Sequence, residues 1–349
     1  MIRKGEYDEA IKYLEPYAGM LKTDTSWSEL LDCLGELYLL QNEWQKTYDL
    51  YHDHIFQKEE DSTLLALSRV YRSAPRLNIP AFPSQNIAFQ PSISGTPVIE
   101  VKVNGKVFHF WVDTGAGMSV LTTSTAKKCG VKILGNGGNA MAATGITIPT
   151  SYAMIDSLRI GQMQVQHLPC LILQNKQLEF RLLGIRIVKI DGIIGWNLLQ
   201  ELSVTFRQDT HQIVFAMPGE KKNGRQDVFW MGVPLFTCTD STGTPLLFTF
   251  DSGANISAVY PQYFPKGDTL HAKEKKVTLG SAGGKRTIRS LTFPRIVLNA
   301  GGQKIVLKKT GTDPALSQGL LSPDGVLGIN VLSKYNFHFD LRGGVFELK

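Results

Sequence analysis

Long apolar runs are missing from this chain of 349 residues. No stretch reaches about 18 consecutive apolar residues, so we expect no helix to span a membrane. The start of the chain has no apolar segment of the kind that directs secretion. The four cysteines form no Cys-x-x-Cys pair, which leaves metal and thioredoxin-type sites without support. Four cysteines are also too few for a disulfide framework in a chain of this length, so we expect reduced thiols in the core.

Several other kinds of site are missing as well. The net charge of +6 is scattered in short clusters, so we expect it to serve solubility and predict no nucleic-acid partner. His52-Asp53-His54 does not predict a metal site, because residues two apart point to different faces of a helix. Gly280 to Arg286 lacks the spacing and the hydroxyl residue of a phosphate-binding loop. No Ser-His-Asp or Cys-His arrangement stands out, and we expect neither a metal nor a cofactor.

The first 72 residues are predicted to be helical, because apolar residues recur every three or four positions and Gly and Pro are few. Gly5 to Ile11 resembles Asn42 to Tyr48, and Leu34-Gly35 puts a small residue where a second helix must pack closely. The segment resembles tetratricopeptide repeats, which are helix pairs of about 34 residues. A generic bundle of helical hairpins fits nearly as well. Either bundle could dock a protein partner or flank the rest of the chain.

The first helix of the repeat that contains Gly5 is missing, so the natural N-terminus, including any signal peptide, could have been removed. The compartment therefore stays open between the cytoplasm and an exported or periplasmic location. Prolines and serines interrupt the helical pattern between residues 73 and 94, and we predict a linker there.

A β pattern begins at Gly95. Val98 to Val103 alternates, Asn104-Gly105 is a strong signal for a two-residue hairpin turn, and Lys106 to Val112 is the partner strand. A similar plan starts again near Val233. We predict two β units, residues 95–222 and 223–349, joined by a charged link around Pro218 to Arg225.

Two short motifs occur twice in the same order and at nearly the same offset. Asp113-Thr114-Gly115-Ala116 and Asp251-Ser252-Gly253-Ala254 each follow an apolar strand. Asp191-Gly192-Ile193-Ile194-Gly195 and Asp324-Gly325-Val326-Leu327-Gly328 come later in each unit. Repeats in the same order indicate a duplicated unit, which could bring two carboxylates face to face across a pseudo-twofold axis.

These motifs resemble those of the retropepsin-like and pepsin-like aspartic proteases, in the form that carries both halves on one polypeptide. The resemblance covers about residues 95–349, and the short lobes make the retroviral type the closer relative. It implies a mainly β fold of two acid-protease barrel lobes related by a pseudo-twofold axis, preceded by the small helical region. Because one chain supplies both lobes, a monomer would suffice for the active site.

The repeated aspartates also suit proteolysis on chemical grounds. Two carboxylates about 3 Å apart cannot both ionise cheaply, so they share a proton, and one group is a ready base and the other a ready acid. Such a pair titrates together, so we assign the two roles jointly to Asp113 and Asp251. Gly115 and Gly253 would let the backbone turn sharply and leave room for water and substrate.

The resemblance implies roles for further residues. Thr114 and Ser252 would form hydrogen bonds across the axis and lock the two loops together. Ile193-Ile194-Gly195 and Val326-Leu327-Gly328 would pack against those loops, although a buried strand after a turn is the plain alternative. Asp191 and Asp324 are interpreted as turn residues.

Mobile flaps should close over the substrate and exclude water. The predicted flap tips are Ala142 to Gly145, with Thr144 and Gly145, and Ser281 to Gly284, with Gly283 and Gly284. No Tyr lies at either tip, which favours flaps of the retropepsin type, and the substrate would lie extended beneath them.

The sequence thus predicts an aspartic endopeptidase acting on peptide or protein substrates through Asp113 and Asp251. The alternative is a non-catalytic scaffold that binds peptides or proteins and keeps the fold without turnover. Both Asp-containing motifs are intact, which favours catalysis.

Overall fold

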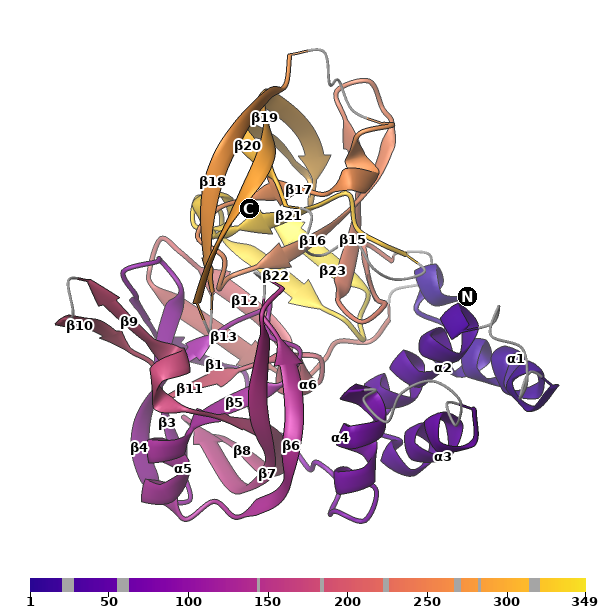
Figure 1. The fold of residues 1–349 in the computed structure, drawn as a ribbon, viewed down its shortest axis with the longest axis vertical. Helices are drawn as coiled ribbons and strands as arrows, with labels where there is room; N and C mark the ends of the chain where they lie inside the picture. The colour runs from indigo at the N-terminus through magenta and orange to yellow at the C-terminus, as the bar shows by residue number, and fades with distance from the viewer. Residues whose placement is uncertain are drawn as a thin grey trace.

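Four α-helices form the N-terminal part of the chain and stand beside two β lobes in the computed structural model (Figure 1). The structure describes residues 1–20, 28–54, 63–142, 145–182, 185–221, 226–266, 271–281, 284–313 and 321–349. The helical elements are η1 (Ile2–Lys4), α1 (Tyr7–Met20), α2 (Ser28–Leu40), α3 (Trp44–His54) and α4 (Thr63–Tyr71). The predicted helical start of the chain is therefore confirmed.

Close packing between α2 and α3 depends on Gly35. A methyl group added to Gly35 would lie only 2.5 Å from the hydroxyl oxygen of Tyr51, so any larger residue would push the helices apart. Leu34, Leu37 and Leu50 are buried around this contact and form an apolar core within the helical region.

The first lobe is an eight-stranded sheet with the order β2-β3-β4-β11-β5-β8-β7-β6, and a further β3–β7 pairing curls it into a barrel. Its strands are β2 (Gln90–Pro91), β3 (Pro97–Val103), β4 (Lys106–Val112), β5 (Ser119–Thr122), β6 (Ile133–Met141), β7 (Thr147–Ile160), β8 (Met163–Leu173) and β11 (Gly192–Ile194). Smaller elements are α5 (Thr123–Cys129), η3 (Asn175–Leu178), α6 (Trp196–Leu199) and the separate β9–β10 pair (Glu179–Leu182, Ile185–Lys189). Asn104 and Gly105 both have positive φ, +47° and +82°, as the predicted hairpin turn requires.

The second lobe repeats this strand order as β14-β15-β16-β21-β17-β20-β19-β18, with the additional pairing β15–β19. Its strands are β14 (Val228–Trp230), β15 (Pro234–Asp240), β16 (Pro245–Asp251), β17 (Ala258–Val259), β18 (Lys273–Ser281), β19 (Gly284–Ala300), β20 (Gln303–Thr312) and β21 (Gly325–Gly328). Its short helices are η4 (Pro261–Tyr263) and α7 (Ile329–Leu332). The fold is thus mainly β, with two barrel-like lobes of matching topology.

A third sheet joins the lobes, and the sequence did not predict this pairing. Its order is β1-β13-β12-β22-β23, so strands of the first lobe pair directly with strands of the second. The strands are β1 (Gln85–Ala88), β12 (Ser203–Arg207), β13 (Gln212–Ala216), β22 (Phe337–Asp340) and β23 (Val345–Leu348). β1 and β2 both fall within the segment predicted as a linker, so the second half of that segment is part of the β structure.

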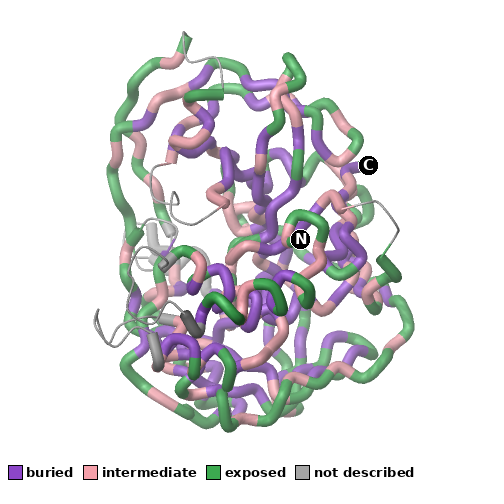
Figure 2. The backbone as a smooth tube through the Cα atoms, turned by 90° about the vertical axis from the view of Figure 1, so that its right-hand side faces the viewer, coloured by how far each residue is buried: buried purple, intermediate pink, exposed green. Residues whose placement is uncertain are grey.

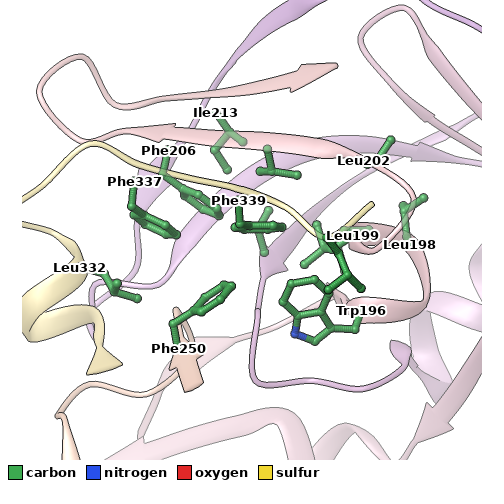
Figure 3. Packing of buried hydrophobic residues seen from close by; sticks show 14 of the residues in the cluster. Trp196, Leu198, Leu199, Leu202, Phe206, Ile213, Phe250, Leu332, Phe337 and Phe339 are labelled. Atoms are coloured by element: carbon green, nitrogen blue, oxygen red, sulfur yellow. The ribbon is translucent and has the colours of Figure 1, made fainter. Parts of the chain in front are cut away.

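Aromatic side chains fill the space beneath this sheet (Figure 3). The rings of Phe206 and Phe337 stack with their centroids 4.3 Å apart, and Phe250 lies 5.2 Å from Phe339. Trp196 of α6 closes the cluster against Phe339. In Figure 2 buried residues run through the inner strands of the molecule, and exposed residues lie mainly around its edge. Residues from both lobes share this core, so the core fixes the lobes relative to each other.

The helical region contacts both lobes. On the first lobe, the Tyr71 hydroxyl lies 2.8 Å from Ala153 O and 2.9 Å from Cys170 O, where it can donate to either carbonyl. On the second lobe, Trp230 N donates to the Tyr7 hydroxyl at 2.9 Å. The helices therefore lie as a side layer that bridges the two lobes (Figure 1).

Candidate active site

Asp113 and Asp251 stand at equivalent places in the two lobes. Asp113 directly follows β4, which pairs in parallel with β11, and Asp251 ends β16, which pairs in parallel with β21. The strand residues before each aspartate, such as Val112 and Phe250, are fully buried, whereas both aspartates are only half-buried. The apolar strands therefore anchor each loop and present its carboxyl group at a surface.

The two aspartate loops hold each other by reciprocal hydrogen bonds. Thr114 N donates to Ser252 Oγ at 3.0 Å, and Ser252 N donates to Thr114 Oγ1 at 2.9 Å. Each hydroxyl then donates to a carbonyl of the opposite strand, Thr114 to Phe250 O at 3.1 Å and Ser252 to Val112 O at 2.8 Å. Four buried bonds thus cross between the lobes and fix the aspartates relative to each other.

Each carboxyl group lies over the glycine of the opposite loop. A methyl group added to Gly115 would lie 2.3 Å from Asp251 Cγ, and one added to Gly253 would lie 2.4 Å from Asp113 Oδ1. A side chain at either glycine would therefore displace the carboxyl group across the axis. The two carboxyl groups therefore occupy one shared space.

The surroundings of the pair favour a bound proton. Burial and the neighbouring charge of Asp251 raise the pKa of Asp113 well above its usual range. Burial also raises the pKa of Asp251, although the N–H groups of Gly253 and Ala254 oppose this by donating to its Oδ1 at 2.7 and 2.9 Å. Gly115 N likewise donates to Asp113 Oδ1, at 2.8 Å. Two carboxyl groups so close cannot both carry a full charge at low cost.

The predicted supporting residues lie directly behind the two loops. Asp113 N donates to Ile194 O at 3.1 Å, and Ile194 and Leu327 are buried. A methyl group on Gly195 would lie 2.6 Å from the backbone of Met118, and one on Gly328 would lie 2.6 Å from the backbone of Ile256. Only glycine allows the loops and these strands to approach so closely.

A second pair of supports escaped the sequence analysis. Ser119 Oγ donates to Asn197 Oδ1 at 2.9 Å in the first lobe, and Ser257 Oγ donates to Asn330 Oδ1 at the same distance in the second. Each serine also accepts from the supporting glycine, Gly195 N at 3.2 Å and Gly328 N at 3.0 Å. The signal was present, because each serine stands six residues after an aspartate and each asparagine two residues after a glycine.

Two β hairpins correspond to the predicted flaps. Gly145 lies in the turn between β6 and β7, and Gly284 begins β19 after β18; Thr144 and Gly283 lie outside the described residues. A methyl group on Gly284 would lie 3.5 Å from Ile146 Cδ1, so the hairpins of the two lobes meet at their tips. Ala142, beside the first tip, belongs to the same apolar cluster as Ala116 of the Asp113 loop. That hairpin therefore lies on the aspartate side of its lobe.

Asp324 is more than a turn residue. It is fully buried, its carboxylate pairs with Lys266 Nζ at 2.9 Å, and Leu247 N donates to it at 2.8 Å. Asp324 therefore has a structural partner within its own lobe. Its counterpart Asp191 is only half-buried.

Within the described residues no helix is long and apolar enough to cross a membrane, and no three His, Cys, Asp or Glu side chains gather as a metal site would need. All four cysteines are free thiols, and all are buried, as expected.

Comparison with known proteins finds one matching family model. Residues 99–189, in the first lobe, match the family described as "gag-polyprotein putative aspartyl protease". Among solved structures, the chain is similar to the crystal structure of a retropepsin-like aspartic protease from Rickettsia conorii, with 18% identity over 40% of this chain and 92% of that one and a TM-score of 0.27. No curated protein matches the chain. The family match and the strand order of the lobes describe a retropepsin-like fold.

Proposed function

We propose that this protein is an aspartic endopeptidase whose catalytic pair is Asp113 and Asp251. The observation that carries the proposal is the shared space of the two carboxyl groups, held by the reciprocal bonds of Thr114 and Ser252. Burial raises the pKa of both groups, so the pair can hold a proton between its two carboxyl groups.

In the proposed reaction a water molecule binds between the two carboxyl groups. The ionised carboxylate takes a proton from this water while the water oxygen forms a bond to the peptide carbonyl carbon. The π electron pair of the carbonyl moves to its oxygen in this step and re-forms the carbonyl when the amine leaves. The other, protonated carboxyl group supplies the proton that the leaving amine nitrogen needs when the carbon–nitrogen bond breaks. One proton is taken and one is given, so the pair can return to its starting state.

The substrate would lie extended beneath the flap hairpins β6–β7 and β18–β19 and pair its main chain with them. Closure of the hairpins, with Gly145 and Gly284 near their tips, would exclude bulk water from the reaction. Both lobes come from one polypeptide, so we propose that a monomer is sufficient for activity.

We also propose that the lobes arose by internal duplication, with residues 95–222 as the first unit and 223–349 as the second. The matching strand order supports this. Residues 1–72 would form a tetratricopeptide-like region with a surface for a protein partner, and the helix pair α2–α3, which packs closely at Gly35, supports that proposal.

Peptide hydrolysis by single-residue variants tests the proposed function. A proteome-derived peptide pool is incubated with the wild-type protein and with Asp113→Asn and Asp251→Asn, and new termini are counted by mass spectrometry. We expect each variant to lose about a thousandfold of activity, because each removes one of the two proton-transfer groups.

Asp191→Asn is the matched control, since it changes a half-buried aspartate of the other repeated motif. Full activity in Asp113→Asn would contradict the proposal. A folded wild-type protein that binds peptides without cutting them would support the non-catalytic scaffold instead.

A further inference from the structure

The two flap hairpins differ sharply in charge. Residues 133–152, which form the first hairpin, contain no Asp, Glu, Lys or Arg. Residues 273–291, which form the second, contain a single acid, Glu274. They also contain a group of exposed cations, which are Lys273, Lys275, Lys276, Lys285, Arg286 and Arg289. The hairpin fold does not by itself require these charges, because the first hairpin forms without any charged residue.

The strand register shows which cations face the opposite lobe. The Cβ position of Gly284 points at Ile146 of the first hairpin, so this face of β19 looks toward the first hairpin. Side chains alternate along a strand, and Arg286 therefore lies on the same face as Gly284. The buried Ser290 is four residues after Arg286 and lies on the same face of β19. Lys275 pairs with Ser290, so Lys275 also lies on this face.

Lys273 shares the face of Lys275 but lies at the base of the hairpin, where its partner Thr292 also pairs with Gly311 of β20. The other charges lie on the outer face of the hairpin. Lys276 pairs with Arg289 across the strands, and Gly280 pairs with Lys285. Glu274 belongs to this outer face too, and its carboxylate lies 3.7 Å from Arg289 Nη1. The one acid of the hairpin is thus turned away from Lys275 and Arg286.

A solvated surface is the plain interpretation of a cluster of lysines, and it suits the outer face. That interpretation does not account for cations on the face that looks toward the first hairpin. A site for single-stranded nucleic acid would typically also offer aromatic side chains on which bases can stack, and residues 273–291 include no Phe, Tyr or Trp. An acidic peptide fits better, because an extended chain under the hairpins would bring its side chains to this face.

We propose that Lys275 and Arg286 of the second flap select peptides that carry an acidic side chain facing that flap. The inference rests on the proposed function, since it assigns a substrate class to the proposed peptidase. It predicts an asymmetric preference, in which side chains that face the uncharged first flap are apolar or neutral.

Binding without turnover tests this proposal directly. Random-sequence decapeptides are passed over immobilised Asp113→Asn protein, and the bound and input pools are sequenced by mass spectrometry. We expect Asp and Glu to be enriched about fivefold in the bound pool, the effect that a partly shielded ion pair typically gives. Adding Lys275→Gln and Arg286→Gln to the Asp113→Asn protein should remove the enrichment, so that the ratio of bound to input falls to about one.

The matched control removes the same charge elsewhere on the same lobe. Lys304→Gln with Lys308→Gln changes two exposed cations of β20, which pair with Asn299 and Arg295 of β19. Arg295 is nine residues from Arg286, about 30 Å along the strand. The fivefold enrichment should survive in this control.

Equal binding of acidic and neutral peptides would overturn the proposal, as would enrichment that persists without Lys275 and Arg286. Displacement of bound peptides by a single-stranded oligonucleotide at equal concentration would also overturn it, in favour of nucleic-acid binding. The proposed function is judged separately, by cleavage with the wild-type protein. Enrichment of acidic peptides without any cleavage by the wild-type protein would support the proposed selectivity and contradict the proposed peptidase activity.

Discussion

The two lobes share a strand order and a pair of aspartate loops, yet their surroundings differ. Met118, five residues after Asp113, packs with the apolar cluster that includes Trp44 and Tyr71 of the helical region. Ile256, five residues after Asp251, is 50% exposed. The flaps differ as well, since one is uncharged and the other strongly basic. The lobes are alike at the aspartate loops. They differ in their contact with the helical region and in the charge of their flap hairpins.

The largest expected difference between the lobes concerns Lys266. It pairs with the fully buried Asp324, so Lys266→Met should lower the free energy of unfolding by about 3 kcal/mol by leaving a buried charge alone. Lys128 stands at the same distance after Asp113 and is exposed, so Lys128→Met should change stability by about 0.5 kcal/mol or less. Urea denaturation of both variants measures the difference, and equal losses would contradict it.

The asparagine supports should differ less. Asn197 is buried, accepts from Ser119 N and Oγ at 2.8 and 2.9 Å, and donates to Pro169 O at 2.6 Å. Asn197→Ala should therefore cost about 2 kcal/mol, because buried partners are left unpaired. Asn330 is exposed, and Asn330→Ala should cost about 1 kcal/mol or less. Thermal unfolding of the two variants under one condition measures the contrast; a larger loss for Asn330→Ala would reverse it.

The helical contact on the first lobe gives a smaller effect. Tyr71→Phe removes a hydroxyl that lies within hydrogen-bond distance of two buried carbonyl oxygens, so we expect a loss of about 1 kcal/mol. Tyr13 on α1 is 56% exposed, and Tyr13→Phe is the control that should leave stability unchanged. Denaturant titration compares the two variants. If Tyr71→Phe behaves like Tyr13→Phe, the hydroxyl does not hold the helices to the lobe.

The aspartate pair also makes stability depend on pH. The raised pKa of Asp113 means that its contribution to stability is complete below about pH 4 and is lost as the pH rises through the folded-state pKa. Asn carries no such charge, so Asp113→Asn should gain in melting temperature relative to wild type as the pH rises from 4 to 8. We expect a gain of about 2 °C or more. A difference that stays constant over this range would show that the pair does not repel.

Local patterns were enough to predict the aspartate loops and the helical start. The turn at Asn104-Gly105 followed from residues that tolerate positive φ, and the loops followed from motifs that occur twice. The sheet that joins the lobes was not predictable in this way, because the pairing of Thr205 with His338 links strands far apart in sequence. No local pattern specifies such a partner.

Burial was harder to predict than secondary structure. Asp324 and Asp191 occupy the same place in the repeated motif, yet only Asp324 is fully enclosed. The ion-pair partner of Asp324, Lys266, comes from a distant part of the chain. The segment before Gly95 looked like a linker because of its prolines, but β1 and β2 find partners in β13 and β3. Pro91 is tolerated in β2 because this strand lies at the edge of its sheet.

The most direct measurement is a titration of the Asp113 carboxyl carbon by NMR, with wild-type protein and with Asp251→Asn. The two carboxyl groups interact strongly, so the pKa of Asp113 should be well above its usual range in the wild type and should fall when the neighbouring charge is removed. Thermal unfolding of Asp251→Asn provides the check that the variant is folded. An Asp113 pKa that is the same in both proteins would contradict the shared-proton pair.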